Sequence, residues 1–202
     1  MKHILFLGLL LLAGCKIAPY NCKCDTSYLH ENDSVFNSHL KENLQGLDKL
    51  FKQRRINKGK VESYRLYMEH SMNRNFQVFN IVVKGNKADL FVQQFERKGR
   101  HRFLDTSFLV NLSVKEWSTI KTSIAKNCFW SLQFKNGKKA GGLDGGILIL
   151  EGYMPTKRNC ANRDHYILYD IVSKDKRMYE IANTILKFAK IEKLRVITPE
   201  HF

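Results

Sequence analysis

Three side chains in the second half of the chain, Asp144, Glu151 and His165, could together perform acid–base chemistry. Asp144 lies in the glycine-rich segment 141–146, where the backbone can adopt positive φ or approach another group closely. Carboxylates and a histidine are the groups from which a hydrolase takes its general acid and general base. These residues are therefore the candidate catalytic set, provided that the fold brings them into one cleft.

A structural role explains the same residues more simply. Glycine and aspartate are the ordinary residues of turns, and an aspartate such as Asp144 accepts hydrogen bonds from local backbone amides. Glu151 ends an apolar strand, where a carboxylate commonly faces a nearby arginine or lysine. The glycine-rich segment lacks the spaced oxygen ligands of a calcium loop and the Lys-Ser or Lys-Thr of a phosphate loop. With no hydrolase signature around the serines or cysteines, we expect no metal and no cofactor, and we favour a non-enzymatic role.

Four cysteines lie beyond residue 20, namely Cys22, Cys24, Cys128 and Cys160. An even number in an oxidising compartment argues for disulfides. Cys22 and Cys24 flank a single residue and would strain a mutual bridge. Two pairings then join the N-terminal segment to the body, unless Cys128 pairs with Cys160 and leaves the other two free. Two distant single cysteines lack the ligand spacing of a structural zinc module.

The chain is strongly basic, with a formal net charge of +15 from 34 lysines and arginines against 19 aspartates and glutamates. The basic residues recur in three separated stretches, at residues 49–60, 97–102 and 135–139. We expect a basic binding surface that includes Arg97, Arg100 and Arg102. Its field would speed encounters with an acidic partner, although general solvation explains the charge equally well.

The N-terminal residues have the organisation of a secretory signal, with a basic start and an apolar run over residues 4–13. This run is about half as long as a membrane-spanning helix requires. The motif Leu12-Ala13-Gly14-Cys15 resembles the lipobox of bacterial lipoproteins, in which the cysteine receives a diacylglycerol and signal peptidase II cuts before it. The resemblance implies removal of residues 1–14 and an anchor in the lipid bilayer through Cys15.

The predicted location outside the cytoplasm limits the kinds of partner that this protein can meet. Lys16 follows the cysteine in place of the aspartate that retains many lipoproteins in an inner membrane, which favours an outer-membrane anchor facing the periplasm. Residues 15–37 are polar and mixed and are predicted to form a lipidated tether, and residues 38–202 suffice for one domain. Outside the cytoplasm we expect no nucleic acid; an acidic protein or an anionic envelope component takes its place.

Hydrophobic periodicity predicts the elements that position these residues. Alternation or continuous apolar runs predict strands beginning at residue 61 and over residues 76–96 (a hairpin turning at Lys84-Gly85-Asn86), 108–112, 129–134, 147–153 and 165–172. Helical spacing predicts helices over residues 40–51, behind a capping box at Ser113 and Glu116, and over 175–191. Strands joined by short turns, with helices between the groups, predict a single α+β domain with a mainly antiparallel sheet and helices packed on one face.

Residues 112–186 resemble an uncharacterised family of exported bacterial proteins with a Gly-Leu-Asp-Gly motif. The matching pieces are Glu116-Trp117, Phe129-Trp130-Ser131-Leu132, Gly142-Leu143-Asp144-Gly145, Glu151-Gly152 and His165-Tyr166. The chain departs from this family after Tyr166, where the family has Arg, Trp and Pro. The resemblance therefore implies an arginine partner for Glu151 or Asp144 that this chain lacks at that position, and it implies no activity.

Three functional hypotheses follow. The first is a membrane-anchored envelope lipoprotein that binds a partner without catalysis, for example an immunity protein that intercepts an antibacterial toxin. The second is an envelope hydrolase that uses Asp144, Glu151 and His165. The third is a structural envelope component that contacts anionic lipid or peptidoglycan.

Overall fold

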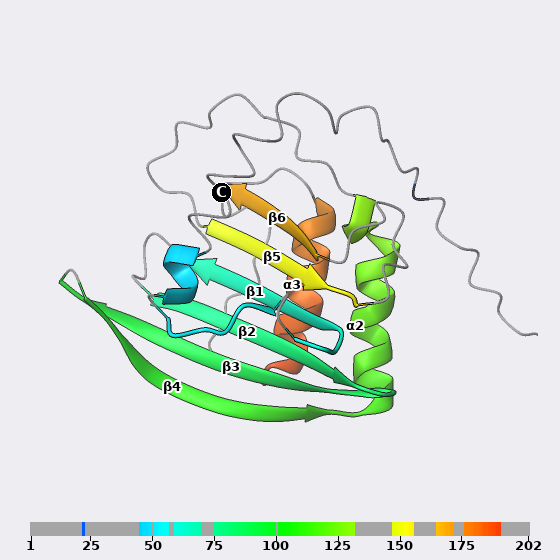
Figure 1. The fold of residues 1–202 in the computed structure, drawn as a ribbon, viewed down its shortest axis with the longest axis horizontal. Helices are drawn as coiled ribbons and strands as arrows, with labels where there is room; N and C mark the ends of the chain where they lie inside the picture. Colours follow the sequence, from blue (N-terminus) through cyan, green and yellow to red (C-terminus); the bar gives the residue numbers. More distant parts are fainter. Residues whose placement is uncertain are drawn as a thin grey trace, which may run out of the picture.

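The computed structural model describes residues 22, 45–49, 51–56, 59–69, 75–99, 101–131, 147–155, 165–171 and 176–190. Within these residues one sheet has the strands β1 (Ser63–Glu69), β2 (Asn75–Lys84), β3 (Lys87–Lys98), β4 (His101–Leu112), β5 (Ile147–Tyr153) and β6 (His165–Ile171). The strand order is β4-β3-β2-β1-β5-β6, and each neighbouring pair is antiparallel (Figure 1). The helices are α2 (Val114–Lys126), the 3-10 helix η3 (Phe129–Ser131) and α3 (Lys176–Phe188). The predicted α+β fold with a mainly antiparallel sheet is confirmed.

The hairpin of β2 and β3 turns where the sequence predicted it. Lys84 pairs with Lys87 across the turn, and Gly85 adopts a φ of 63°, a conformation that glycine reaches without steric cost. The following strand, β4, begins at His101, seven residues before the alternating apolar run that predicted a strand over 108–112. Pairing with β3 extends it, since β3 continues to Lys98 and pairs with β4 as far as His101.

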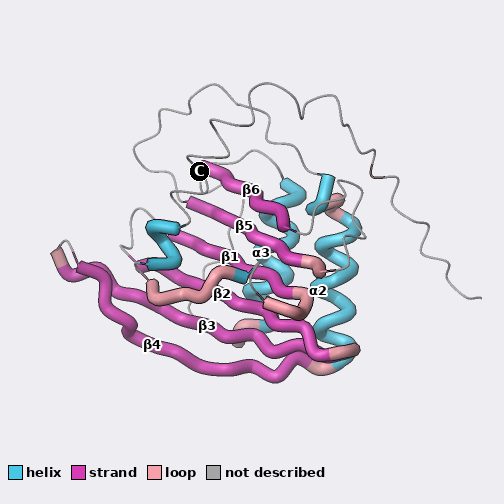
Figure 2. The backbone as a smooth tube through the Cα atoms, in the orientation of Figure 1, coloured by secondary structure: helices cyan, strands magenta, loops and turns pink. Residues whose placement is uncertain are grey.

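The main core lies between one face of the sheet and helices α2 and α3. Figures 1 and 2 show both helices behind the same face. Helix α2 buries Trp117, Ile120 and Ile124, and its predicted capping box is present: Ser113 N–H donates to Glu116 Oε2 at 2.8 Å, and Glu116 N–H donates to Ser113 Oγ at 3.3 Å. The buried cluster also takes alternate residues of five strands, among them Tyr64, Leu66, Phe79, Ile81, Leu90, Val92, Leu112, Leu148 and Leu150.

The segment 45–56 covers part of the face of the sheet opposite to α2 and α3, which we call the second face. The sequence pattern did not predict this position. Residues 45–49 are helical, and Phe51 stacks on Phe76 with ring centroids 4.1 Å apart. Phe51 belongs to a second buried cluster with Phe76, Phe95, Tyr67, Val78 and Ile149. Central strand β1 is therefore covered on both faces, and side chains from Ser63 to Met68 are all buried. The part of this face that segment 45–56 leaves uncovered carries the candidate site.

The predicted strand over residues 129–134 is wrong in its described part. Residues Phe129–Ser131 form η3, and Ser131 N–H donates to the carbonyl oxygen of Cys128 at 2.8 Å. Cys128 has a φ of 53°, which turns the chain directly after α2. Phe129 is fully buried, as its apolar character indicates. A single helical turn can bury this side chain as well as a strand can. The closing helix, predicted over 175–191, is α3.

Candidate functional site

Of the candidate catalytic residues, only Glu151 has a side chain within the described part of the structure. Glu151 lies on β5 with 5% of its surface exposed, and its Oε2 lies 3.6 Å from Nη1 of Arg65 on neighbouring strand β1. The expectation that Glu151 faces an arginine is therefore confirmed, although Glu151 lies within β5 and not at its end. His165 begins β6, where its backbone pairs with Tyr153, and its side chain lies outside the described part, as does all of Asp144. The hydrolase alternative, which requires the three residues to converge in one cleft, therefore stays a hypothesis.

Arg65 is the centre of a buried polar network. Its side chain is 4% exposed, and Nη1 donates to Asp48 Oδ1 at 2.7 Å and to the Tyr67 hydroxyl at 3.1 Å. Nε donates to Asn80 Oδ1, and Nη2 donates to the carbonyl oxygen of Arg54. A guanidinium that is buried and always charged needs several acceptors, because a donor without an acceptor has lost its bond to water. The network thereby fastens segment 48–54 to strands β1 and β2.

Asp48 and Tyr67 are hydrogen-bonded to each other within this network. The Tyr67 hydroxyl donates to Asp48 Oδ1 at 2.6 Å. Burial raises the pKa of Asp48 above its ordinary value, although Tyr67 and Arg65 partly oppose the shift. Burial also raises the pKa of Tyr67 well above its usual range, so its hydroxyl stays protonated and acts as a donor. The network therefore holds a firmly bound phenolic proton on Tyr67.

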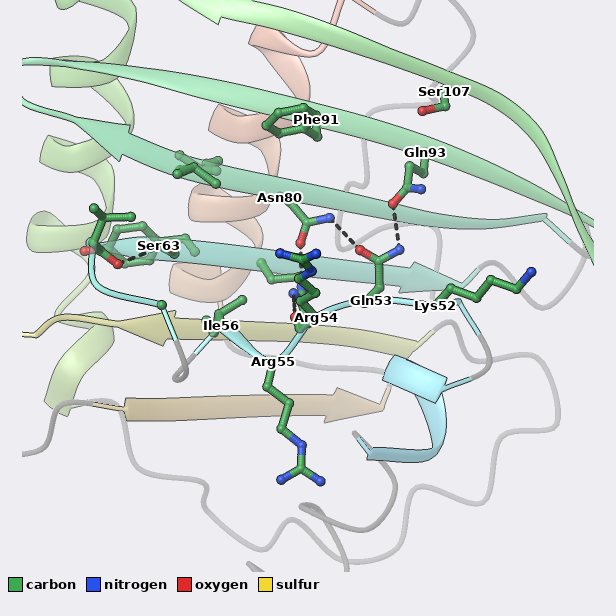
Figure 3. Close-up of a pocket in the computed structure, with 16 residues that line it drawn as sticks. Lys52, Gln53, Arg54, Arg55, Ile56, Ser63, Asn80, Phe91, Gln93 and Ser107 are labelled. Atoms are coloured by element: carbon green, nitrogen blue, oxygen red, sulfur yellow. Dashed lines mark hydrogen bonds between the residues drawn. The ribbon is translucent and has the colours of Figure 1, made fainter.

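A second set of amides continues the network toward β3. Gln53 Nε2 donates to Gln93 Oε1 at 2.7 Å and to the Phe51 carbonyl oxygen at 2.8 Å. Asn80 Nδ2 in turn donates to Gln53 Oε1 at 3.0 Å (Figure 3). The register explains the meeting, because Asn80 and Arg65 are cross-strand partners and Gln93 lies two residues from Phe91, the partner of Asn80. Each amide is thus held in one orientation.

The side chains of Gln53, Asn80 and Gln93 form the floor of a pocket of about 760 Å³. Asn80, Gln93, Phe91 and Ser107 come from β2, β3 and β4, and residues 52–56 form the opposite wall (Figure 3). The ring of Phe91 is 42% exposed there. A volume of this size falls within the usual range of ligand sites, which combine apolar surface with a few fixed polar groups. The pocket can therefore hold a small molecule or a side chain of a partner protein.

The rim of the pocket is cationic. Lys52, Arg54 and Arg55 have exposed side chains, and Figure 3 shows Arg55 pointing away from Asn80 and Gln93. None of the described residues that line the pocket is an aspartate or a glutamate. A cationic rim whose lining contains no carboxylate attracts anions, and this attraction weakens as salt rises.

The basic surface expected at Arg97, Arg100 and Arg102 is arranged differently. Arg102 is a structural residue: Nη2 lies 2.5 Å from Glu69 Oε1, and the guanidinium packs over the rings of Phe51 and Phe76. Arg97 is exposed and donates through Nε to the Gly99 carbonyl oxygen, whereas Arg100 lies outside the described residues. The exposed positive charge of segment 52–55 is the better candidate, within a basic stretch that the sequence had also marked.

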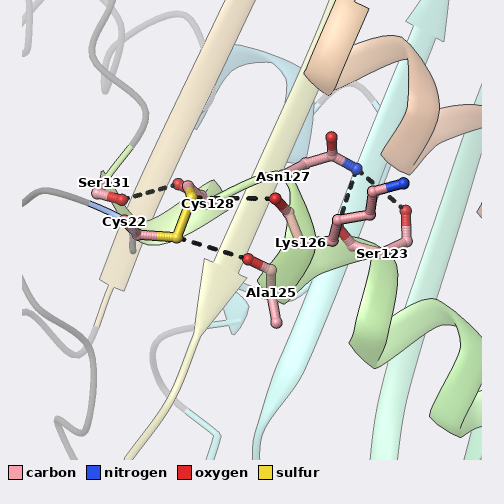
Figure 4. Close-up of a disulfide and its surroundings, with 7 residues drawn as sticks. All are labelled: Cys22, Ser123, Ala125, Lys126, Asn127, Cys128 and Ser131. Carbon is pink, nitrogen blue, oxygen red and sulfur yellow. Dashed lines mark hydrogen bonds between the residues drawn. A yellow bond between two sulfur atoms is a disulfide. The ribbon is translucent and has the colours of Figure 1, made fainter. Parts of the chain in front are cut away.

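A disulfide joins Cys22 to Cys128 at the end of α2, with the two Cα atoms 5.5 Å apart (Figure 4). This is one of the pairings that the sequence left open; Cys24 and Cys160 lie outside the described residues. The polar groups around the bridge are bonded locally, since Asn127 Nδ2 donates to the Ser123 carbonyl oxygen and Ser131 Oγ to that of Cys128. The predicted tether over residues 15–37 is thus fastened to the domain at residue 22.

In the described part of the chain, no group of three or more His, Cys, Asp or Glu residues has the geometry of a metal site, and no helix is long and apolar enough to cross a bilayer. No protein-family model, curated protein or solved structure matches this chain. The lipobox resemblance, whose residues lie outside the described part, and the resemblance to exported bacterial proteins both stay predictions.

The sequence did not reveal the residues at the centre of the site. Arg65 carried one usable signal, since a charged residue in an alternating strand between Tyr64 and Leu66 must either face water or find buried partners. Asp48 and Gln53 carried none, because polar residues in a helix or loop are usually solvated. Asn80 lies on β2 between the buried Phe79 and Ile81, where the alternation alone predicts a solvated side chain. Only the register of β1, β2 and β3 brings them together.

Proposed function

We propose that this protein is a membrane-anchored envelope lipoprotein that binds an acidic partner without catalysis, and that the pocket on the second face of the sheet is its binding site. The observation that carries the proposal is the composition of the pocket. A cationic rim at Lys52, Arg54 and Arg55 surrounds a floor of amides that are already fixed by hydrogen bonds, with no described carboxylate among the lining residues.

The internal bonding of the floor favours binding over catalysis. Gln53 and Asn80 are tied to each other and to neighbouring groups before any ligand arrives, so little side-chain entropy is lost on binding. Glu151, the candidate acid, faces Arg65 and is almost fully buried. A carboxylate held in this way contributes to the fold and is hardly accessible to a substrate.

The proposed anchor sets where the site works. With a lipid on Cys15, the disulfide at Cys22 lies seven residues further along the chain than the anchor. An extended chain spans at most about 3.5 Å per residue, so the bridge would lie within roughly 25 Å of the bilayer. A metabolic fatty-acid label should mark the wild-type chain and leave Cys15→Ser unmarked; label on the variant would contradict the anchor.

The binding site is tested by charge neutralisation with a matched control. The variant K52Q/R54Q/R55Q removes the cations of the rim, and K115Q/K121Q/K126Q removes the same charge from exposed positions of α2. Both variants are expressed in cells, crosslinked in the intact envelope and compared for the captured partner. We expect the rim variant to lose most of the capture and the α2 variant to retain it.

Two results would contradict the proposal. Equal loss of capture in both variants would mean that net charge, rather than the rim, attracts the partner. Capture that is unaffected by the rim variant would remove the pocket from binding altogether. With the purified partner, complex formation should slow as salt rises from about 0.05 to about 0.5 M, because exposed charges are screened over that range.

A further inference from the structure

The outer edge of β4 is the most exposed apolar surface of the described sheet. β4 is an edge strand, and none of the described strands pairs with its outer side (Figures 1 and 2). Leu104 is 53% exposed and Leu109 is 46% exposed, and Phe91 on β3 pairs directly with Leu109. Large apolar side chains therefore line the second face beside a strand edge.

The C-terminal part of this edge, residues 106–112, lacks the devices that usually prevent strands from pairing. Natural edge strands are protected by charged side chains, proline or bulges. Residues 106–112 of β4 contain no charged residue and no proline. The irregularity in the pairing of β3 and β4 lies before this stretch, between Gln94 and Phe95, and from Thr106 to Leu112 the register is regular. Half of β4 is thus a regular, uncharged edge that a further strand can join.

The edge and the pocket form one continuous surface. Phe91 lines the pocket and is the cross-strand partner of Leu109, and Ser107 of β4 also lines the pocket. A strand added beside β4 would place alternate side chains on this face, next to Leu109 and toward the rim at Lys52 and Arg54. Apolar side chains of the added strand would match the surface at Leu109, and acidic side chains would match the rim at Lys52 and Arg54.

We propose that the partner is a protein with an extended acidic segment, which adds as a strand along residues 106–112 of β4 and directs its acidic side chains to the pocket. This inference rests on the proposed binding function and specifies its partner. The main chain of the segment would pair with the side of β4 that no described strand occupies, and side chains would supply specificity, as in other cases of strand addition. Charge decides between occupants: a chain with a net charge of +15 repels a second copy of itself and attracts an acidic segment.

The test uses a displayed library of random nine-residue peptides, selected against the full chain in detergent. Peptides that bind should be rich in Asp and Glu, with apolar residues at alternate positions. On Leu109→Asp their affinity should fall at least about tenfold, whereas on Val114→Asp it should change less than about twofold. Val114 is 45% exposed at the start of α2, which makes it a control of matched exposure and charge.

Two further measurements separate strand addition from side-chain contact. Amide hydrogen exchange over residues 106–112 should slow when a selected peptide binds. Methylation of alternate backbone nitrogens of that peptide, which leaves its side chains unchanged, should abolish binding in one of the two frames.

Other outcomes overturn the inference in distinguishable ways. Selected peptides that lack acidic residues, or that bind Leu109→Asp and Val114→Asp equally, would exclude strand addition at β4. If oligogalacturonate bound instead and K52Q/R54Q/R55Q abolished that binding, the pocket would keep its function with a glycan as its ligand. A dimer in sedimentation that Leu109→Asp dissociates would replace the partner with a second copy.

Discussion

Gly152 on β5 offers a direct test of how tightly the main core is packed. A Cβ atom at this position would lie 2.5 Å from Cε1 of Phe129, 3.0 Å from Cζ of the same ring and 3.1 Å from Cη2 of Trp130. Ordinary van der Waals contact needs about 3.4–4 Å. The Phe129 side chain is fully buried, so the ring cannot move aside into solvent. Gly152→Ala should therefore force a rearrangement of η3.

Two opposing effects set the magnitude. Alanine restricts the unfolded chain and so stabilises the fold by about 0.4–1 kcal/mol where it fits. Overpacking a filled core costs about 1–3 kcal/mol. Gly152→Ala should thus lower the free energy of unfolding by about 1–2 kcal/mol. Gly46→Ala is the matched control, because Gly46 lies in the helical segment with nothing within 4 Å of its Cβ position. That variant should gain up to about 1 kcal/mol.

The difference between the two variants isolates the steric clash, since both share the gain from the unfolded state. Urea unfolding with the disulfide intact, followed by fluorescence of Trp117 and Trp130, measures both free energies. In the double variant Phe129→Leu/Gly152→Ala, the total cost should be smaller than the sum of the single costs, because leucine vacates the position of the ring. Equal stability of Gly152→Ala and Gly46→Ala would refute the packing of η3 against β5.

Three other predictions concern the polar network and the bridge. Arg65→Met should lower the free energy of unfolding by about 3–5 kcal/mol in denaturant titrations, since it leaves two buried carboxylates without their cation, whereas Lys115→Met on exposed α2 should change it by less than about 0.5 kcal/mol. The raised pKa of Asp48 means that the folded state binds this proton more tightly than the unfolded state does. The stability of the wild type relative to Asp48→Asn should therefore fall as pH rises from the ordinary pKa of 3.8 through the folded pKa. A stability difference that grew with pH would contradict the burial of Asp48. Cys22→Ser should cost about 2–5 kcal/mol, as expected for a bridge with a sequence separation of 106, and reduction of the wild type should reproduce that loss.

Much of the fold could be predicted from local sequence. The periodicity located β5 at its observed bounds, the turn at Gly85 and the capping box at Ser113, because each depends on neighbouring residues alone. The same reasoning failed for η3 and for the start of β4, because both depend on distant groups. Phe129 is buried by the strands of the sheet, and the first half of β4 is held in place by pairing with β3.

The sequence by itself determined the composition of this protein's surface and the character of its elements: a basic, cysteine-containing α+β chain, with one basic stretch at residues 49–60 among others. Only the tertiary structure decided which of these charges are available. Arg65 and Arg102 are bound by Asp48 and Glu69, whereas Lys52 and Arg54 are exposed at the rim of the pocket. The physical reason is that a charge has the same value wherever it lies in a sequence, but its burial and its partners depend on strand register, which brings together residues far apart in the chain.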